Sequence, residues 1–544
     1  MARPAKGQKP LASFPPCRRR ASGRASGLAD RDHRRRQRRP GMIRKAALAL
    51  ALLLPLPATA AGPQFTLTRI ETPASVYLNA AEIAGVTADY TARPITFDDL
   101  QQMMHRLQGL YEAAGVPTAE AVLPAQDIHG GVLKVDFIEA AIEQVEVKGN
   151  GSTNPLFFRQ ALSLREGEKP DFTRLERELR VLAQSHDLAP GLDFAPGAQA
   201  AGTRVTITGN EPKNLRFALS ADNHGRDETG RQRLQASVQW ASLTGWRDRL
   251  GLNVTRTSGA WSAAVSYDRP VGTAGGRLVF GIHGSNSQVI GGSFSGARVV
   301  SDAAGFSLGY RFALQMAHDR SLYASFGMTH DRTQSEIAGV QFVDTKLNEI
   351  TAELSYRRSI PLTEFGGTAR LRAGSAKSAG GALTDGGYGV LQFSGFANRR
   401  ISEGYALTAA LDGQMASKLH LPVARQFGVG GTEILRGYPS DVRAAPEALA
   451  LRLQLVKLDP WRMGGNRLAI QPYVFADAAI LRTSASIGSR TTAADRLFSA
   501  GFGANFTFDG RYGLHALVGV PLRPTTGFTD SGSAIALLGI SVNF

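Results

Sequence analysis

Apolar side chains alternate with small or polar ones over the last part of the chain, from Phe498 to Phe544. In the stretch 498–508, one face carries four phenylalanines, and the other carries serine, glycine, asparagine and threonine. A repeat of two residues indicates a β-strand, because successive side chains of a strand point to opposite faces. A strand between lipid and water has this pattern, although the strands of a soluble β-sandwich alternate as well.

Strand-like runs continue from Leu215 to the C-terminus, separated by glycine, asparagine, aspartate and serine. We count 15 such runs over residues 214–544, without a helical repeat. Because a bacterial single-chain barrel has an even number of strands, we predict a transmembrane β-barrel of about 16 antiparallel strands. In the first run, Leu215 and Phe217 alternate with charged or small residues such as Arg216. Charged residues on the inward face predict a water-filled lumen.

Two similar units precede the barrel region and combine helical and strand patterns. The first unit, residues 64–139, has a helical run at 98–111 and three strand-like runs. The second unit, residues 140–213, repeats this order around a helix at 171–184. A unit of about 75 residues lies at the small end of the range for a domain. The predicted fold class is therefore two α+β modules followed by an all-β transmembrane barrel.

The strongly basic composition belongs to the N-terminus. Residues 1–60 carry +13 of the formal net charge of +16, so the part after residue 60 is nearly neutral. Residues 42–60 have a basic start, an apolar run and an Ala-Thr-Ala end, which is typical of a secretory signal peptide. Their apolar run is shorter than the 18 or so residues that a transmembrane helix needs. Residues 1–41 are interpreted as upstream sequence from a mis-assigned start codon, with a basic nucleic-acid-binding tail as the alternative.

The remaining composition argues against a metal site and an enzyme active site. Cys17 is the only cysteine, and the ten histidines show no metal-ligand spacing, so we expect no metal and no cofactor. Gly305-Phe-Ser-Leu-Gly309 matches the nucleophile pattern of hydrolases, but that chemistry needs a strand-turn-helix elbow. Here the residues that follow simply continue a strand. The mature chain is therefore predicted to be neither an enzyme nor a nucleic-acid-binding protein.

One long loop, at about 428–446, interrupts the strand pattern and contains Leu435-Arg-Gly-Tyr438. Further along, Asp477 lies on the opposite face of its strand from Val474, so we expect its carboxylate to point into the lumen. An arginine and a carboxylate can form a charge-assisted, bidentate contact. Such a contact would hold the loop inside the barrel. The residues alone leave open the alternative that Arg436 is a solvated turn residue.

The order of these elements resembles the two-partner secretion transporters of the Gram-negative outer membrane, the haemolysin and filamentous-haemagglutinin secretion family of TpsB type. The matching features are a signal peptide, two modules, a barrel, the Arg-Gly-Tyr loop, the Phe475-x-Asp477 strand and the terminal Phe544. In that family the modules are called POTRA, for polypeptide-transport-associated, and lie in the periplasm. The resemblance covers residues 64–544. Three further stretches support it, at 122–128, 129–135 and 221–230.

The resemblance implies export of an unfolded partner, a large secreted exoprotein of TpsA type. Its N-terminal secretion domain would dock on the first module by adding a strand to a sheet edge, whose unpaired backbone groups invite such pairing. We expect the docking groove to lie between the strand at 119–123 and the helix at 98–111. Its expected lining residues are Ala119, Ala121, Val122, Leu123, Met103 and Leu107.

The resemblance also implies roles within the barrel. Arg436 would pair with Asp477, beside Phe475, while Gly437 and Tyr438 shape the loop tip. Phe544 would be the terminal signal that the barrel assembly machinery reads during insertion into the lipid bilayer. Leu435 stands where many members have valine. The few residues between the expected cleavage site and the first strand leave no room for the plug helix of some members.

An outer-membrane assembly factor, which inserts other barrels instead of exporting a chain, is the alternative function. Relatives of that kind usually carry more than two modules. The sequence does not identify the exported protein or the oligomeric state.

Overall fold

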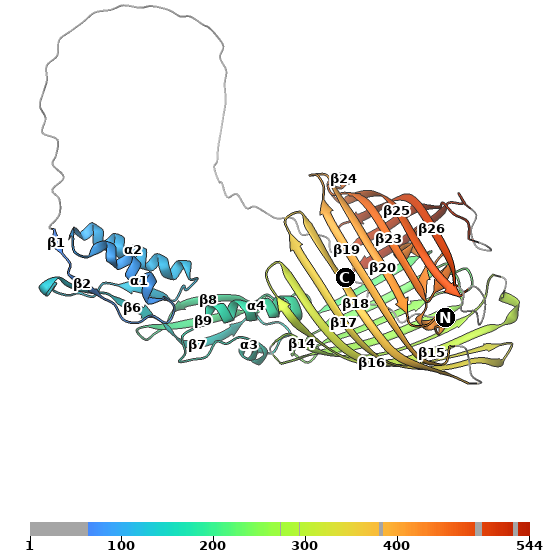
Figure 1. The fold of residues 1–544 in the computed structure, drawn as a ribbon, viewed down its shortest axis with the longest axis horizontal. Helices are drawn as coiled ribbons and strands as arrows, with labels where there is room; N and C mark the ends of the chain where they lie inside the picture. Colours follow the sequence, from blue (N-terminus) through green and yellow to red (C-terminus); the bar gives the residue numbers. More distant parts are fainter. Residues whose placement is uncertain (1–63, 273, 293, 380–383, 485–491, 526–530) are drawn as a thin grey trace, which may run out of the picture. The chain divides into compact units, whose positions relative to one another are not determined.

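The computed structural model describes residues 64–272, 274–292, 294–379, 384–484, 492–525 and 531–544 (Figure 1). The expected signal peptide at 42–60 and the expected extension at 1–41 lie outside the described residues. The chain divides into two compact units. Of the described residues, one unit contains 64–114 together with 120–137, and the other contains 115–119 together with those from 138 to the C-terminus.

The first of these units is built on helix α2 (Phe97–Ala113), whose apolar positions recur at helical spacing. The helix begins with a capping box, in which Thr96 and Asp99 each accept a hydrogen bond from the other's backbone N–H. Helix α1 (Ala80–Thr87) lies against α2 and has a capping box of its own, made by Asn79 and Glu82. The residues of α2 that form the core are Leu100, Met103, Leu107 and Tyr111.

Short strands complete this module and pair two by two as β1–β3, β2–β5 and β4–β6. The division between the two compact units passes through β4 and β6. The strands are β1 (Phe65–Thr66), β2 (Arg69–Glu71), β3 (Pro94–Ile95), β4 (Ala119–Val122), β5 (Val132–Lys134) and β6 (Asp136–Glu139).

The second module has a three-stranded sheet in the order β7–β9–β8, made of β7 (Ala141–Lys148), β8 (Gly191–Pro196) and β9 (Gly202–Thr208). Helix α4 (Phe172–His186) covers the expected helix at 171–184 and is capped by Asp171. Helix α3 (Pro155–Ala161) was not predicted, although an asparagine cap followed by proline is a typical helix start. Its Phe157 and Phe158 join the core of the module.

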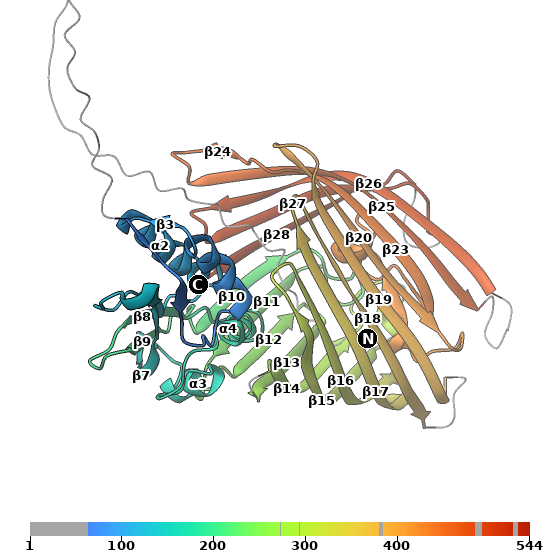
Figure 2. The ribbon, with the colours of Figure 1, turned by 60° about the vertical axis from the view of Figure 1, so that its left-hand side comes forward.

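Sixteen antiparallel strands then form a closed barrel, as the sequence predicts, so the predicted fold class is confirmed. Figures 1 and 2 show the strands following one another around the wall in chain order. Strand β24 (Trp461–Met463) extends β23 along the same neighbour, β25, and is counted with β23. The other strands are β10 (Leu215–Asp222), β11 (Arg233–Ala241), β12 (Arg249–Arg256), β13 (Ala260–Val271), β14 (Gly276–Gln288), β15 (Val299–Met316), β16 (Arg320–Ile337), β17 (Val340–Ile360), β18 (Thr363–Ser378), β19 (Gly386–Arg400), β20 (Tyr405–Ala416), β23 (Glu447–Lys457), β25 (Leu468–Ser484), β26 (Thr492–Phe508), β27 (Tyr512–Pro521) and β28 (Ile535–Asn543).

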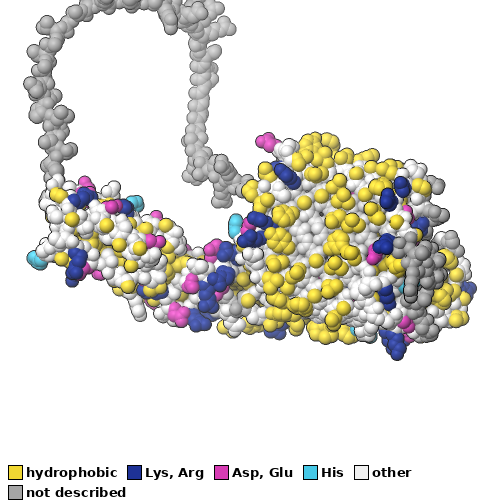
Figure 3. Space-filling model, in the orientation of Figure 1, with side chains coloured by type: hydrophobic (Ala, Val, Ile, Leu, Met, Phe, Trp, Pro, Cys, Tyr) yellow, Lys and Arg dark blue, Asp and Glu magenta, His cyan; other side chains and the backbone are white. Residues whose placement is uncertain are grey.

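The outer face of the barrel is apolar, and in Figure 3 hydrophobic side chains cover much of it. On β25 the even positions Val474 and Ile480 are exposed, whereas Tyr473, Phe475 and Asp477 are buried on the inner face. This parity is the one expected for a strand between lipid and lumen. Among the described residues, no helix is both long and apolar enough to span a membrane.

Candidate lumenal loop and wall site

A long insertion, residues 417–446, connects β20 to β23. It begins eleven residues before the expected loop boundary at 428, because β20 ends at Ala416. Two of its segments, β21 (Phe427–Val429) and β22 (Arg443–Ala445), pair as an antiparallel hairpin. Between them lies the tip, which starts with the short helix α5 (Gly431–Ile434). Gly430 has a φ of 119°, and a Cβ there would lie 2.1 Å from the carbonyl oxygen of Pro439, so only glycine fits this turn.

Arg436, in the tip of this insertion, forms a fork-shaped ion pair with Asp477 on β25. Its Nη2 lies 2.7 Å from Oδ1 and its Nε 2.9 Å from Oδ2. The backbone N–H of Arg436 donates to the same Oδ2 over 2.9 Å. On β23, Arg436 Nη1 lies 2.6 Å from Gln454 Oε1 and Nη2 lies 3.3 Å from the carbonyl oxygen of Leu453. The expected pairing of loop and wall is therefore present in the structure, and Arg436 is not a solvated turn residue.

Burial makes this pair costly to break. The Arg436 side chain is 8% exposed and that of Asp477 is fully buried. The guanidinium also lies over the ring of Phe475, with 4.0 Å between its carbon and the ring centroid. A charge left unpaired in such surroundings costs several kcal/mol, about 3 to 5. Phe475 and Asp477 thus contact the same guanidinium, as two residues on one face of a strand can.

Gly437 and Tyr438 fit the tip against β26 and β27. Gly437 has a φ of 90°, and a Cβ there would lie 3.1 Å from the backbone nitrogen of Val520. Tyr438 is fully buried, and its hydroxyl lies 3.0 Å from the carbonyl oxygen of Phe498 and 2.9 Å from that of Arg523. Leu435 is also fully buried and packs in the same core cluster as Tyr438. The Leu-Arg-Gly-Tyr sequence is thus fitted to the wall at all four residues.

The tip continues to the segment between β10 and β11. Ser440 Oγ donates to the carbonyl of His224 over 2.7 Å, and Asp441 forms an ion pair with Arg226. The spacing of Arg226 and Asp441 gave no sign of this contact, because the two residues are 215 positions apart. Contacts between such distant residues follow from barrel closure.

The first and last strands close the barrel over a short ladder of five residue pairs, from Ala218 opposite Asn543 to Asp222 opposite Gly539. Phe544 extends this ladder, since its backbone N–H donates to the carbonyl of Phe217 over 2.9 Å. The Phe544 side chain is half exposed on the barrel. Its expected role as an assembly signal stays a prediction.

Half of the residues expected to line a docking groove are core residues of the first module. Met103 and Leu107 are fully buried, and Ala119 is 5% exposed. Three further residues, Ala121, Val122 and Leu123, are half-buried. The backbone N–H of Ala121 donates to the side-chain oxygen of Gln108 on α2 over 3.0 Å. Any docking strand would therefore meet β4 itself and the Gln108 side chain before it met Met103 or Leu107.

A charged junction joins α4 of the second module to the barrel. Arg247 donates to the carbonyl of His186 through Nε and Nη2, at 3.1 and 2.9 Å. Arg277 Nη1 lies 3.0 Å from His186 Nδ1, which must accept because a guanidinium only donates. Burial, followed by the positive charges of Arg277, Arg249 and Arg247, lowers the pKa of His186 to about 3.

Sequence reasoning missed a second charged contact of the insertion, that of Arg425 with Glu349 and Asp331. Strand parity places Glu349 on the inner wall, but nothing in the sequence pairs it with a residue 76 positions away. Within the described ranges, no group of histidine, cysteine and carboxylate side chains is arranged to hold a metal ion.

Comparison with known proteins gives two family matches. Residues 201–506 match the family described as haemolysin secretion/activation protein ShlB/FhaC/HecB, and residues 65–140 match the ShlB-type POTRA domain. The outer membrane transporter CdiB of Dickeya dadantii is 28% identical over 220 residues, which are 40% of this chain and 38% of the relative. The heme/hemopexin transporter protein HuxB of Haemophilus influenzae (strain 86-028NP) is 26% identical over 183 residues, covering 33% of this chain and 32% of the relative.

The matched stretches thus span less than half the length of these curated relatives. Among solved structures, CdiB from Escherichia coli superposes with a TM-score of 0.67 over 90% of this chain and 92% of that one, at 18% identity. At this identity the likeness shows the fold alone.

Proposed function

Since the chain belongs to the haemolysin secretion/activation protein family ShlB/FhaC/HecB, we propose that it is the transporter of a two-partner secretion pair, which exports an unfolded partner protein through its barrel. The family and the closed barrel place the chain in the Gram-negative outer membrane, with its POTRA modules in the periplasm. The family is one of secretion proteins and not of enzymes. Its name favours export over the alternative of barrel assembly.

The observation that carries the proposal is the buried contact between Arg436 and Asp477. The ion pair holds a long insertion inside a barrel whose wall is otherwise a simple sequence of hairpins. A passive pore has no need of such an element. A transporter does need such an element, because its pore must stay closed until an exported chain displaces the insertion.

Docking of the partner on the first module supports the proposal at its periplasmic end. We place the docking strand along β4, where Ala121, Val122 and Leu123 are half-buried and Gln108 already occupies one backbone N–H. An incoming strand would replace the Gln108 side chain with its own carbonyl oxygen. Its side chains would then contact the surface beside α2, while Met103 and Leu107 support that surface from the core.

The partner is a large secreted exoprotein with an N-terminal secretion domain. The relatives in the comparison are named as transporters, one of them a heme/hemopexin transporter, and the cargo of this chain is open. We assign Phe544, at the end of the closing ladder, to recognition by the barrel assembly machinery during insertion into the lipid bilayer.

The test is export in cells that carry the chain and its cognate exoprotein. We expect Arg436→Ala and Asp477→Ala each to reduce export at least tenfold, while both variants still form a heat-modifiable barrel in the outer membrane. Arg467→Ala is the matched control, because it removes an exposed ion pair with Asp509 that does not touch the insertion. Normal export by both Arg436→Ala and Asp477→Ala would contradict the proposal.

A further inference from the structure

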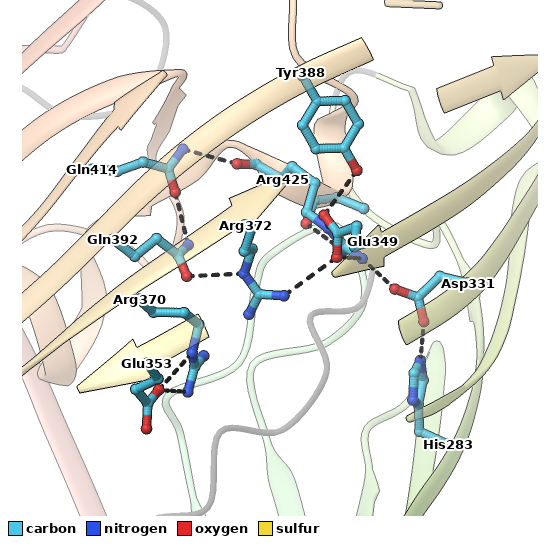
Figure 4. A network of polar contacts seen from close by, with 11 residues as sticks. His283, Asp331, Glu349, Glu353, Arg370, Arg372, Tyr388, Gln392, Gln414 and Arg425 are labelled. Carbon is cyan, nitrogen blue, oxygen red and sulfur yellow. Dashed lines mark hydrogen bonds and ion pairs between the residues drawn. The ribbon is translucent and has the colours of Figure 1, made fainter. Parts of the chain in front are cut away.

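The insertion has a second buried anchor, eleven residues before Arg436. Arg425 ends a short helical turn, Val423–Arg425, and is 6% exposed. Figure 4 shows its guanidinium between the carboxylates of Glu349 on β17 and Asp331 on β16. Arg425 Nε lies 2.7 Å from Glu349 Oε1 and Nη2 lies 2.9 Å from Oε2. The same Nη2 forms an ion pair with Asp331.

Wall residues from three further strands complete this anchor. The hydroxyl of Tyr388 on β19 donates to Glu349 over 2.8 Å, and Arg372 Nη1 on β18 donates to it over 3.3 Å. His283 on β14 lies 3.2 Å from Asp331 Oδ1. Glu349 therefore has two further hydrogen-bond partners on the wall besides Arg425, and Asp331 lies beside the ring of His283.

The two anchors lie on well-separated parts of the barrel wall. Arg425 binds β16 and β17, the seventh and eighth strands, whereas the tip binds β25 through Arg436 and packs on β26 and β27 through Gly437. In a closed wall of 16 strands, β17 with Glu349 and β25 with Asp477 are five strands apart, and β16 and β27 are eight strands apart. The insertion therefore spans the lumen between these two parts of the wall.

The base of the insertion is fastened close to Arg425. Gln414 on β20 is 1% exposed, and its Nε2 donates to the carbonyl of Arg425 over 2.8 Å and to that of Pro446 over 3.0 Å. One side chain thus joins both limbs of the hairpin. Leu421, which is also 1% exposed, packs in a small core on the inner wall with Leu347 and Tyr388.

The two anchors differ in what remains when they open. Among the described residues, Arg436 is the only cation in an ion pair with Asp477, so its departure would leave a buried carboxylate unpaired. Glu349 keeps Arg372 and Tyr388 when Arg425 leaves, and Asp331 Oδ1 stays 3.2 Å from the ring of His283. Because unpaired buried charges are the main cost of breaking such pairs, the Arg425 anchor is the cheaper one to open.

We propose that Arg425 is a positioning residue that holds the insertion across the lumen and is the anchor that releases to open the pore. The proposal deepens the proposed export function, since release at Arg425 would let the hairpin move toward β25 while the Arg436 pair stays closed. An exported chain would then pass on the side of β16 and β17. The Arg425 anchor, and not the Arg-Gly-Tyr contact, would thus set how often the pore is open.

The test is the conductance of the purified full-length protein in planar lipid bilayers. We expect Arg425→Met to raise the fraction of time in open states at least threefold, because methionine keeps the bulk but not the charge. Arg425→Lys, which keeps the charge but loses the fork, should lie between Arg425→Met and the wild type. Arg370→Met is the matched control, since Arg370 pairs with Glu353 on the neighbouring strand and does not touch the insertion.

A second variant removes the same contact in another way, in case Arg425→Met does not fold. Glu349→Gln combined with Asp331→Asn removes both carboxylates and leaves Arg425 in place, and it should raise the open fraction as Arg425→Met does. Wild-type conductance in both variants, with heat-modifiable barrels, would overturn the proposal. The proposed export function would fail in a different experiment, in which the wild-type protein does not export its partner. The difference in conductance between Arg425→Met and Arg370→Met does not depend on that result.

Discussion

At the scale of single residues, a few polar side chains satisfy one another's hydrogen-bond donors and acceptors. Arg436 places every one of its donor nitrogens on a wall acceptor, and Asp477 receives three of these contacts. In a low-dielectric interior, a connected network of hydrogen bonds stabilises the fold more than the same bonds would separately. Gly437, the next residue, is therefore sensitive to substitution, since the Arg436 guanidinium reaches Asp477 only when the backbone lies close to the wall.

We predict that Gly437→Ala abolishes most export without preventing barrel insertion. An alanine at a positive φ costs about 1 to 2 kcal/mol, and here its Cβ would also meet Ser499, Gly519 and Val520 at 3.1 to 3.2 Å. The tip would have to move from β26 and β27, with Arg436 attached to it. Secretion assays and heat-modifiability measure the two effects.

Gly510→Ala is the matched control for this prediction. Gly510 also has a positive φ, of 69°, but a Cβ there would meet nothing within 4 Å. We expect Gly510→Ala to carry the conformational cost alone and to export normally. Equal export by the two variants would mean that close packing of Gly437 on the wall has no role.

At the scale of elements, how much the sequence predicts depends on whether the cause is local. Strand alternation and the even-number rule predict 16 strands, and α2 and α4 follow from helical spacing and capping residues. The run count missed β12, because Gly251 and Asn253 look like turn residues until both are placed on the inner face of a strand. The pairing of Arg425 with Glu349 could not be predicted, since only closure of the barrel brings those residues together.

The proposed docking edge shows the same limit. The pattern 119–123 correctly indicates a strand, but which of its neighbours are exposed depends on packing, and Met103 and Leu107 prove to be core. Gln108, at helical spacing among apolar residues, was not singled out. Its contact with the Ala121 N–H is visible only once α2 lies against β4.

We predict that Gln108→Ala strengthens binding of the exoprotein's N-terminal domain to the full-length protein, lowering the Kd by a factor of two to five. The physical reason is that the Ala121 N–H would no longer be occupied before the partner strand arrives, and a net hydrogen bond is worth about 1 kcal/mol. Calorimetry or surface binding of the purified domain would measure the change. Gln101→Ala, on the exposed face of the same helix, should leave the Kd unchanged. An unchanged or weaker affinity for Gln108→Ala would place docking elsewhere.

At the scale of the whole molecule, the barrel and the second module belong to one compact unit, and the charges at their junction hold them together. Arg247 and Arg277 extend from the barrel to the end of α4, where they bind the carbonyls of Ser185 and His186. Glu211, before the first barrel strand, accepts hydrogen bonds from the backbone N–H groups of Gly151, Ser152 and Thr153. These contacts fasten the second module to the barrel wall.

His186 makes this junction sensitive to acid. Its pKa is lowered from 6.5 to about 3 by burial and by the nearby arginines, so the free imidazole takes up a proton at a pH where the buried one does not. Above about pH 6.5 the ring is neutral in both states and the contact has its full strength. As the pH falls from 6.5 toward 3, the detached state gains the proton and is favoured, at about 1.4 kcal/mol for each unit of pKa difference.

We therefore predict that acidification from pH 7.5 to pH 5 increases hydrogen exchange in the C-terminal half of α4, whereas the barrel strands keep their protection. The matched variant is His186→Gln, which can accept from Arg277 and does not titrate; it should remove most of the difference between the two pH values. The wild type should respond alike in low and moderate salt, because burial of the neutral ring, and not an exposed surface charge, keeps the proton off His186 in the attached state. An α4 whose exchange, corrected for the intrinsic rate, is equal at both pH values would show that the His186 contact with Arg277 does not hold the module to the barrel.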